Sequence, residues 1–135
     1  MDAQFSFRVD RGKGLVRITM SGLFTLEAID DFLRARTEAH AELGTRPNEH
    51  LTLNDLRGMK IQAQDVVARF REMLAAPEFR SRRLAFVAGP TLARSQLMRA
   101  LSGRDARCFE DPAVAEAWLL AEEADRSAPR RATGS

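Results

Sequence analysis

The stretch "LAFVAG", Leu84 to Gly89, decides the fold, because it contains no polar residue between Leu84 and Ala88. A strand with one face in water alternates apolar and polar side chains, so a continuous apolar run indicates a strand that is buried on both faces. Strands of this kind are typical of parallel sheets with helices on both sides. We therefore expect an α/β fold in which this segment is a central strand.

The segment before this strand predicts another strand followed by a helix. The residues "HLTLNDL", His50 to Leu56, predict a short strand, and the Asp-Leu-Arg-Gly sequence from Asp55 to Gly58 is expected to form a corner after it. A helix should begin around Gln62 and end before Pro77. Its apolar positions follow helical spacing: Val66, Val67, Phe70, Met73 and Leu74.

The N-terminal segment predicts a hairpin and a long amphipathic helix. Residues 5–9, "FSFRV", and 15–20, "LVRITM", each alternate apolar and polar side chains, as half-buried strands do. Residues 10–14, "DRGKG", supply glycines for a tight turn, so the first strand should be antiparallel to the second and lie at an edge. Thr25 is a suitable N-cap for the helix, and Gly44 a suitable stop.

The segment after Gly89 predicts two more helices and a minimal strand. Thr91 can cap a helix that extends to Leu101, and residues 107–109 predict a short strand. Asp111 and Pro112 form a cap and a first-turn proline for a last helix, with Val114, Ala117, Trp118 and Ala121 on one face. The order ββαβαβαβα predicts a small mixed, mostly parallel sheet of about five strands with about four helices in a single domain.

The basic excess of the chain lies in its C-terminal tail. Residues 124–135 hold Arg126, Arg130 and Arg131 against Asp125, and the rest of the chain has equal numbers of basic and acidic residues. We expect residues 1–123 to form the domain and residues 124–135 to be a disordered basic tail.

A basic stripe with interleaved aromatic residues, which would indicate nucleic-acid binding, is missing. The one local cluster, Arg80, Arg82 and Arg83, is interpreted as solvated arginines beside a strand, with phosphate contact as the less favoured alternative. We therefore expect no nucleic-acid partner.

Cysteine usage and hydropathy favour a cytoplasmic protein. Cys108 is the single cysteine, so no intramolecular disulfide can form, which favours a reducing compartment. No export signal and no apolar run long enough to span a bilayer occurs, so we expect no membrane insertion. No Cys/His cluster has metal-ligand spacing, and we expect neither a metal nor a cofactor.

No constellation in the sequence indicates catalysis. His40 and His50 lack the neighbours that nucleophilic catalysis requires and are interpreted as surface histidines. Residues 88–96, "AGPTLARSQ", join a strand to a helix, but one glycine without a Walker lysine does not make a nucleotide site. The chain is therefore predicted not to be an enzyme.

The chain resembles the SpoIIAA-like group, relatives of the STAS domain (sulfate transporter and anti-sigma factor antagonist). The resemblance rests on the "DLRG" sequence at residues 55–58, on "LAFVAG" and on the ending "RCFEDPAVAEAWL" at residues 107–119, and it extends from Phe5 to Leu120. It implies a STAS/SpoIIAA-like fold that binds protein partners or small ligands without chemistry of its own.

The same resemblance locates a candidate partner-binding surface. In phosphorylatable STAS proteins the corner resembles Asp-Leu-Ser-Gly, and a serine or threonine at the start of the next helix accepts the phosphate. Here Arg57 replaces the first serine, and the acceptor positions fall at about Gln64 and Asp65, with no Ser or Thr between Asn54 and Val66. A non-catalytic regulatory module without this switch is predicted, with the following contact residues: Asp55, Arg57, Lys60, Gln64 and Asp65.

Two alternatives concern ligands and oligomers. SpoIIAA-like domains are similar to CRAL-TRIO lipid-binding domains, which implies a second function as carrier or sensor of a small apolar ligand. The side chains that would line its pocket, or else form ordinary core, are Phe70, Met73, Leu74, Met98 and Trp118. An exposed sheet edge leaves a homodimer open.

Overall fold

The computed structural model describes residues 2–45, 49–75, 81–89 and 106–127. The predicted helix between Thr91 and Leu101 lies outside the described residues. The described elements, in chain order, are β1 Gln4–Asp10, β2 Leu15–Gly22, α1 Leu26–Leu43, β3 Leu51–Met59, α2 Gln64–Ala75, β4 Arg83–Val87, β5 Ala106–Phe109 and α4 Pro112–Ser127.

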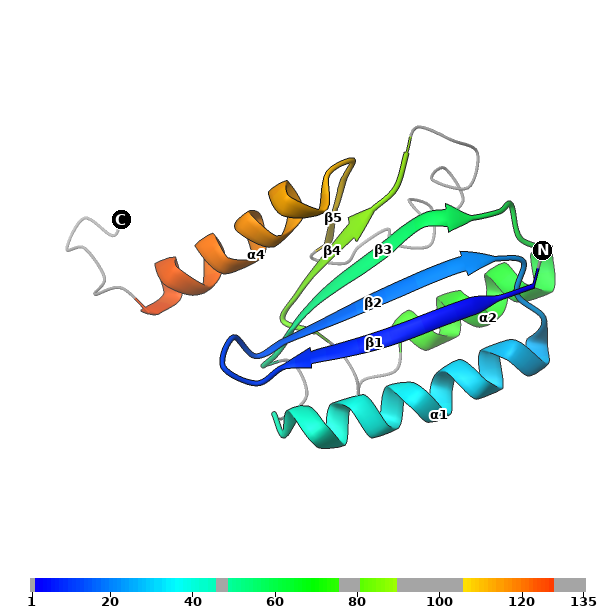
Figure 1. Ribbon diagram of the computed structural model, residues 1–135, viewed down its shortest axis with the longest axis horizontal. Helices are drawn as coiled ribbons and strands as arrows, with labels where there is room; N and C mark the ends of the chain where they lie inside the picture. Colours follow the sequence, from blue (N-terminus) through cyan, green and yellow to red (C-terminus); the bar gives the residue numbers. More distant parts are fainter. Residues whose placement is uncertain (1, 46–48, 76–80, 90–105, 128–135) are drawn as a thin grey trace.

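The strands form one five-stranded sheet in the order β1-β2-β3-β4-β5 (Figure 1). β1 is antiparallel to β2, and the remaining neighbours are parallel. The predicted mixed, mostly parallel sheet with an antiparallel edge strand is therefore confirmed. Crossover connections carry the helices onto the faces of such a sheet.

The local signals at the N-terminal hairpin and the first helix are confirmed. Gly14 has a φ of 61°, which closes the turn between β1 and β2. The Thr25 hydroxyl accepts a hydrogen bond from the Ala28 N–H at 3.0 Å, so it caps α1. Gly44 ends α1 in the left-handed conformation, and its N–H donates to the His40 carbonyl at 3.0 Å.

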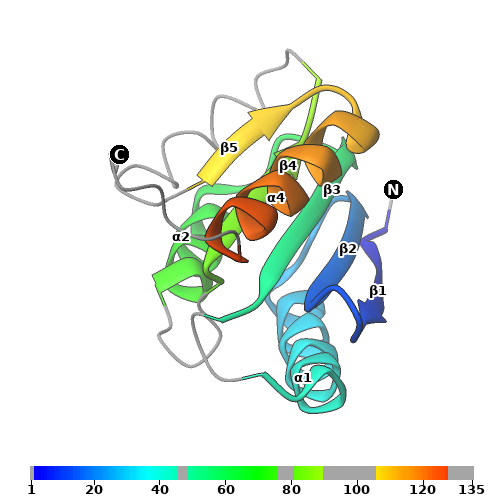
Figure 2. The same ribbon diagram turned by 90° about the vertical axis from the view of Figure 1, so that its left-hand side faces the viewer.

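Helices cover both faces of the sheet, with α1 and α2 on one face and α4 on the other (Figure 2). The side chains of β4 are buried on both faces of the sheet, as its apolar sequence predicts. Its side chains alternate between two clusters: Leu84 and Phe86 lie on the face of α2, and Ala85 and Val87 lie under α4. β4 is thus interior to the sheet, between β3 and β5.

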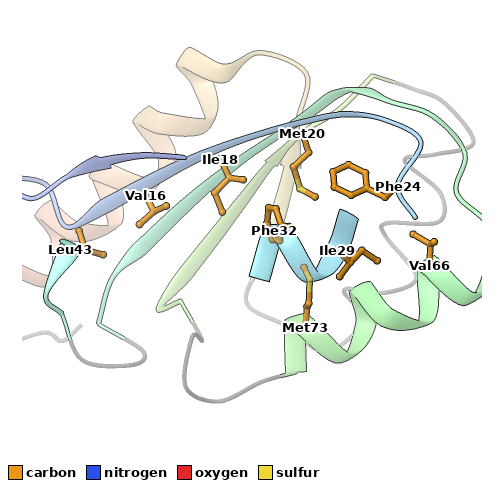
Figure 3. Close-up of a cluster of buried hydrophobic side chains, with 9 residues drawn as sticks. All are labelled: Val16, Ile18, Met20, Phe24, Ile29, Phe32, Leu43, Val66 and Met73. Atoms are coloured by element: carbon orange, nitrogen blue, oxygen red, sulfur yellow. The ribbon is translucent and has the colours of Figure 1, made fainter. Parts of the chain in front are cut away.

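The larger apolar cluster joins β2 to α1 and α2 (Figure 3). The side chains of β2 that point to these helices are Val16, Ile18 and Met20, and they meet Ile29 and Phe32 of α1. The remaining buried members are Phe24, Leu43, Val66 and Met73. Period-2 alternation in the strand and helical spacing in the helices produce this common interface.

Helix α4 buries a side that is shifted from the one its sequence suggested, with Trp118 packed in both. Ala115 and Leu119 are fully buried against β3 and β4, whereas Val114 is 53% exposed and Ala117 and Ala121 are exposed. In an alanine-rich helix both sides are apolar enough to pack, so periodicity alone did not select the buried one. α4 continues to Ser127, past the expected domain end at residue 123, while residues 128–135 lie outside the described residues.

Candidate functional site

The candidate surface lies on a part of β3 that extends beyond its neighbour β4. β3 pairs with β4 only as far as Asp55, opposite Val87, and then continues along β2 to Met59. We call residues 56–59 the β3 overhang. The expected corner at residues 55–58 is therefore wrong, because the chain remains extended there and leaves the sheet only after Met59.

Gly58 has a packing role in the overhang. It pairs with Ser21 of β2, directly after a register shift between Thr19 and Ser21. A Cβ atom added at Gly58 would lie 2.7 Å from the Ser21 Cβ, closer than packed carbon atoms approach. Gly58 therefore permits the close approach of β2 and β3, and it does not form part of a turn.

Asp55 and Arg57 form an ion pair at the base of the overhang. The Arg57 Nη2 donates to the Asp55 Oδ2 at 2.7 Å, and its Nε and backbone N–H donate to Oδ1 at 3.0 and 3.1 Å. Burial would raise the pKa of Asp55, but these hydrogen bonds outweigh it and hold the pKa below its usual value. Asp55 lines a hollow together with residues of α4. The hydrogen bond to Asp55 raises the pKa of Arg57, and Asp111, directly before α4, adds to this rise. Both side chains therefore lie on the α4 side.

A polar hollow adjoins this ion pair between the sheet and the start of α4. Its volume is about 220 Å³, and its lining includes Asp55, Thr19, Arg17 and Glu116. The Arg17 Nη2 donates to the Glu116 Oε1 at 2.6 Å, and the Lys13 Nζ donates to Oε2 at 3.2 Å. The hydrogen bond from Arg17, reinforced by Lys13, lowers the pKa of Glu116 against the effect of burial. No sequence signal points to Arg17 and Glu116, because they are far apart in the chain.

The other three predicted contact residues lie around the end of the sheet. Lys60 is exposed directly after the overhang, and its N–H donates to the Gly22 carbonyl at 3.2 Å. Gln64 and Asp65 are exposed in the first turn of α2, which packs on the face opposite α4. The predicted surface is thus two groups: Asp55 and Arg57 on the α4 face, and Gln64 and Asp65 on the α2 face.

Gln62 joins the two loops at this end of the sheet, whereas its sequence position predicted only the start of a helix. Its side chain is 7% exposed and lies between two loops. The Oε1 accepts from the Phe24 N–H at 2.9 Å, and the Nε2 donates to the carbonyls of Gly22 and Lys60 at 3.0 and 2.5 Å. The buried Phe24 N–H donates to this amide, and the Gly22 carbonyl accepts from it as well as from the Lys60 N–H. The loop after β2 is therefore fixed to the loop before α2.

The structure does not bring the predicted apolar pocket residues together. Phe70 and Met73 belong to the cluster between α1, α2 and the sheet. Trp118 lies on the opposite face, with its ring 5.6 Å from that of Phe109. The sheet separates these groups. The side chain of Leu74 and all of Met98 lie outside the described part of the chain.

The expectation that both histidines are surface residues is wrong for His50, which is 1% exposed. His40 Nδ1 lies 2.9 Å from the Arg36 carbonyl, which can only accept, so this nitrogen carries the proton. The neutral His40 Nε2 must then accept, and His50 Nε2 donates to it across 3.1 Å. Ser81 lies 3.3 Å from the same His50 nitrogen.

This pair forms because α1 ends beside the first residues of β3 and β4, an arrangement that residue spacing does not reveal. Burial, His40 and Arg82 together lower the pKa of His50 to about 4. The pKa of His40 is also lowered, chiefly by burial. Both rings are therefore neutral near pH 7.

No group of three or more His, Cys, Asp or Glu side chains among the described residues could hold a metal ion. Among the helices that the structure describes, none is long and apolar enough to cross a membrane.

Comparison with known proteins shows the fold. A crystal structure of an uncharacterised DUF3478-family protein with a SpoIIAA-like fold, from Shewanella loihica PV-4, matches with a TM-score of 0.65 and 16% sequence identity, over 87% of this chain and 94% of that one. An anti-sigma factor antagonist from Mycobacterium paratuberculosis matches with a TM-score of 0.53 and 16% identity, over 87% and 95% of the two chains. No family model matches, and no curated protein matches. The chain therefore has a SpoIIAA-like fold, as the sequence resemblance implied.

Proposed function

We propose that this protein is a cytoplasmic, non-catalytic regulatory module that binds a protein partner through the β3 overhang and the residues beside it. The observation that carries the proposal is the Asp55–Arg57 ion pair, whose arginine is exposed on a strand end that β4 does not cover. Among the described strands, none pairs with this side of the overhang, and strand backbone beside exposed charged side chains is a surface suited to docking another chain.

The charges and rigidity of this surface support the proposal. Two hydrogen bonds to Asp55 hold the Arg57 guanidinium in one orientation, so less side-chain entropy is lost when a partner docks. Gln62 fixes the adjoining loops, which present Lys60 on one side and Gln64 and Asp65 on the other. A partner that reaches around this end of the sheet is proposed to contact all five predicted residues.

The proposed module does not use a phosphorylation switch at this place. Residues 55–65 contain no hydroxyl side chain, and Asp65 already carries a negative charge at the start of α2. An acidic side chain at a helix N-terminus is favourable. We therefore propose that docking does not depend on phosphorylation of this segment.

The alternative, carriage of a small apolar ligand, receives less support from the geometry. Trp118 is across the sheet from Phe70 and Met73, so these residues do not line one pocket. Phe70 packs against Phe24 with ring centroids 5.6 Å apart, as core residues do.

The proposal is tested by affinity capture from the host with the wild-type chain, Arg57→Glu and Gln64→Ala. A matched control is Arg34→Glu, because Arg34 is also exposed and also forms an ion pair, with Asp31 on α1. We expect Arg57→Glu to lose a partner that Arg34→Glu retains, and Gln64→Ala to show whether the α2 side takes part. An identical set of captured proteins with all four chains would refute the proposed surface.

A further inference from the structure

The outer edge of β1 is a regular strand edge that no described strand covers. β1 is the first strand of the sheet, and among the described strands it pairs with β2 alone. All seven residues of β1 pair with β2 in one unbroken register. Proline, lysine and bulges, which commonly keep an edge strand from pairing with another chain, are absent from β1. β2 separates β1 from β3, so this edge is distinct from the surface proposed above.

One hydrogen bond identifies the backbone groups that face this edge. The Leu51 N–H donates to the Gly14 carbonyl at 2.8 Å, so this carbonyl points towards β3. In a trans peptide the next N–H, that of Leu15, points the opposite way, towards β1 and its pairing partner Asp10. Alternate residues of β1 therefore bond to β2, beginning with Asp10. The backbone N–H and C=O groups that point outward belong to the residues between them: Phe5, Phe7 and Val9.

The same three residues carry the large apolar side chains of β1. Phe5, Phe7 and Val9 pack against the cluster under α1 but remain half-buried. The side chains of β2 that point the same way are buried. The other face of β1 is polar, with Ser6 and Arg8 exposed. A strand added at this edge would cover apolar side chains on one face and meet polar ones on the other.

We propose that a second copy of this chain pairs with β1 in an antiparallel orientation, about a two-fold axis at Phe7. In this register Phe7 lies opposite Phe7 of the other copy, and Phe5 lies opposite Val9. Because these residues have the outward backbone groups, their pairs are the hydrogen-bonded ones. Aromatic and β-branched side chains that lie opposite each other stabilise a sheet. The two sheets become one continuous sheet with the two copies of β1 at its centre.

The polar face of β1 is also self-complementary in this register. Ser6 lies opposite Arg8 of the other copy and Gln4 lies opposite Asp10, so no like charges are directly opposite. The two Arg8 side chains are diagonal neighbours, each with a Ser6 hydroxyl opposite. An axis at Arg8 would instead place the two arginines opposite each other, and an axis at any residue other than Phe7 would pair fewer than the seven residues of β1.

Helix α1 is compatible with this approach. It runs along β1 (Figure 1), so the two copies of α1 would lie side by side under the joined sheets. Asp30 of α1 forms an ion pair with Arg69 of α2. Ala28 and Ala35, two turns apart, lie on the side of α1 that is turned away from Asp30. Small side chains on that side let the axes of two helices come close.

Charge substitutions at Ser6 test the interface and its register in the full chain. Sedimentation equilibrium of the wild type should show a monomer–dimer equilibrium. Ser6→Lys places a positive charge opposite Arg8 at two points of the dimer, so it should raise the dissociation constant about threefold or more. Ser6→Glu places a negative charge there and should lower the constant by a similar factor. Thr19→Lys and Thr19→Glu are the matched controls, because Thr19 is exposed and pairs with Ser6 but lies one strand farther from the edge; they should change the constant less than about twofold.

Disulfide cross-linking gives an independent test of the register. Ser6 and Arg8 of the other copy form a non-hydrogen-bonded pair with Cα atoms about 4.5 Å apart, which is within disulfide range. A mixture of Ser6→Cys and Arg8→Cys chains, both with the single native cysteine removed by Cys108→Ser, should form a linked dimer faster than either chain alone. The proposal is overturned if the wild type is monomeric at about 1 mM, if neither Ser6 variant changes the dissociation constant, or if the mixture links no faster than the separate chains.

Discussion

Acidification from about pH 7 to about pH 5 should lower the free energy of unfolding by about 2 kcal/mol, because the unfolded chain then binds a proton that His50 cannot accept in the fold. The pKa of His50 is lowered from 6.5 to about 4 in the folded state. The unfolded state therefore binds more protons between these values. Stability is at its full value above about pH 6.5 and falls as the pH decreases towards about pH 4.

The magnitude follows from the size of the pKa change. A difference of roughly 2.5 units at about 1.36 kcal/mol per unit corresponds to about 3 kcal/mol in total. About two thirds of it should be lost by about pH 5, where the carboxylates are still ionised. His40, whose pKa is lowered in the same direction, adds to the effect. Arg36 and Arg82 oppose protonation of the two rings.

The assay is urea denaturation at a series of pH values, with His50→Gln as the comparison. The amide side chain that replaces the imidazole would not titrate, so this variant should be less stable near pH 7 but should lose at least half of the dependence on pH. An unfolding free energy that stays constant across this range would refute the account of the buried pair. The same dependence of the unfolding free energy on pH in the wild type and in His50→Gln would also refute this account.

Three substitutions test the packing of the described elements. Gly58→Ala should lower the free energy of unfolding by about 1–3 kcal/mol, because its Cβ would meet Ser21 at 2.7 Å. Ser21→Gly in the same chain should recover part of this stability in thermal denaturation. If Gly58→Ala is as stable as the wild type, the two strands can separate. Gln62→Ala should lower the free energy of unfolding by about 1–3 kcal/mol, because it removes the acceptor of the buried Phe24 N–H. Hydrogen exchange should show faster exchange of the Phe24 amide, and unchanged exchange would contradict the role of Gln62. Trp118→Ala should lower the free energy of unfolding by about 3 kcal/mol, because the ring packs between α4 and β5. A decrease below about 1 kcal/mol would mean that the ring contributes little to packing.

The strands and caps were predictable because their signals are local. The apolar run at Leu84, the caps at Thr25 and Gly44, and the alternation in β1 and β2 each depend on neighbouring residues only. The side on which Asp55 lies also follows from strand alternation, since residues 51, 53 and 55 share one face.

The remaining features depend on contacts between distant segments. The β3 overhang exists because β4 ends before β3 does, and the register shift between β2 and β3 sets the fit of Gly58. The pairing of His40 with His50 requires the end of α1 to lie beside the first residues of β3. Hydrophobic periodicity carries no information on these distances, which explains why the sequence suggested surface histidines and a corner at residues 55–58.

The most direct test of the proposed function is the dissociation constant of the captured partner, measured for the wild type, Arg57→Glu and Arg34→Glu. If the β3 overhang is the docking surface, Arg57→Glu should weaken binding by about tenfold or more, and Arg34→Glu should leave it within about twofold. Equal affinities for Arg57→Glu and the wild type would contradict the central claim, because a reversed charge in the middle of a docking surface cannot be silent.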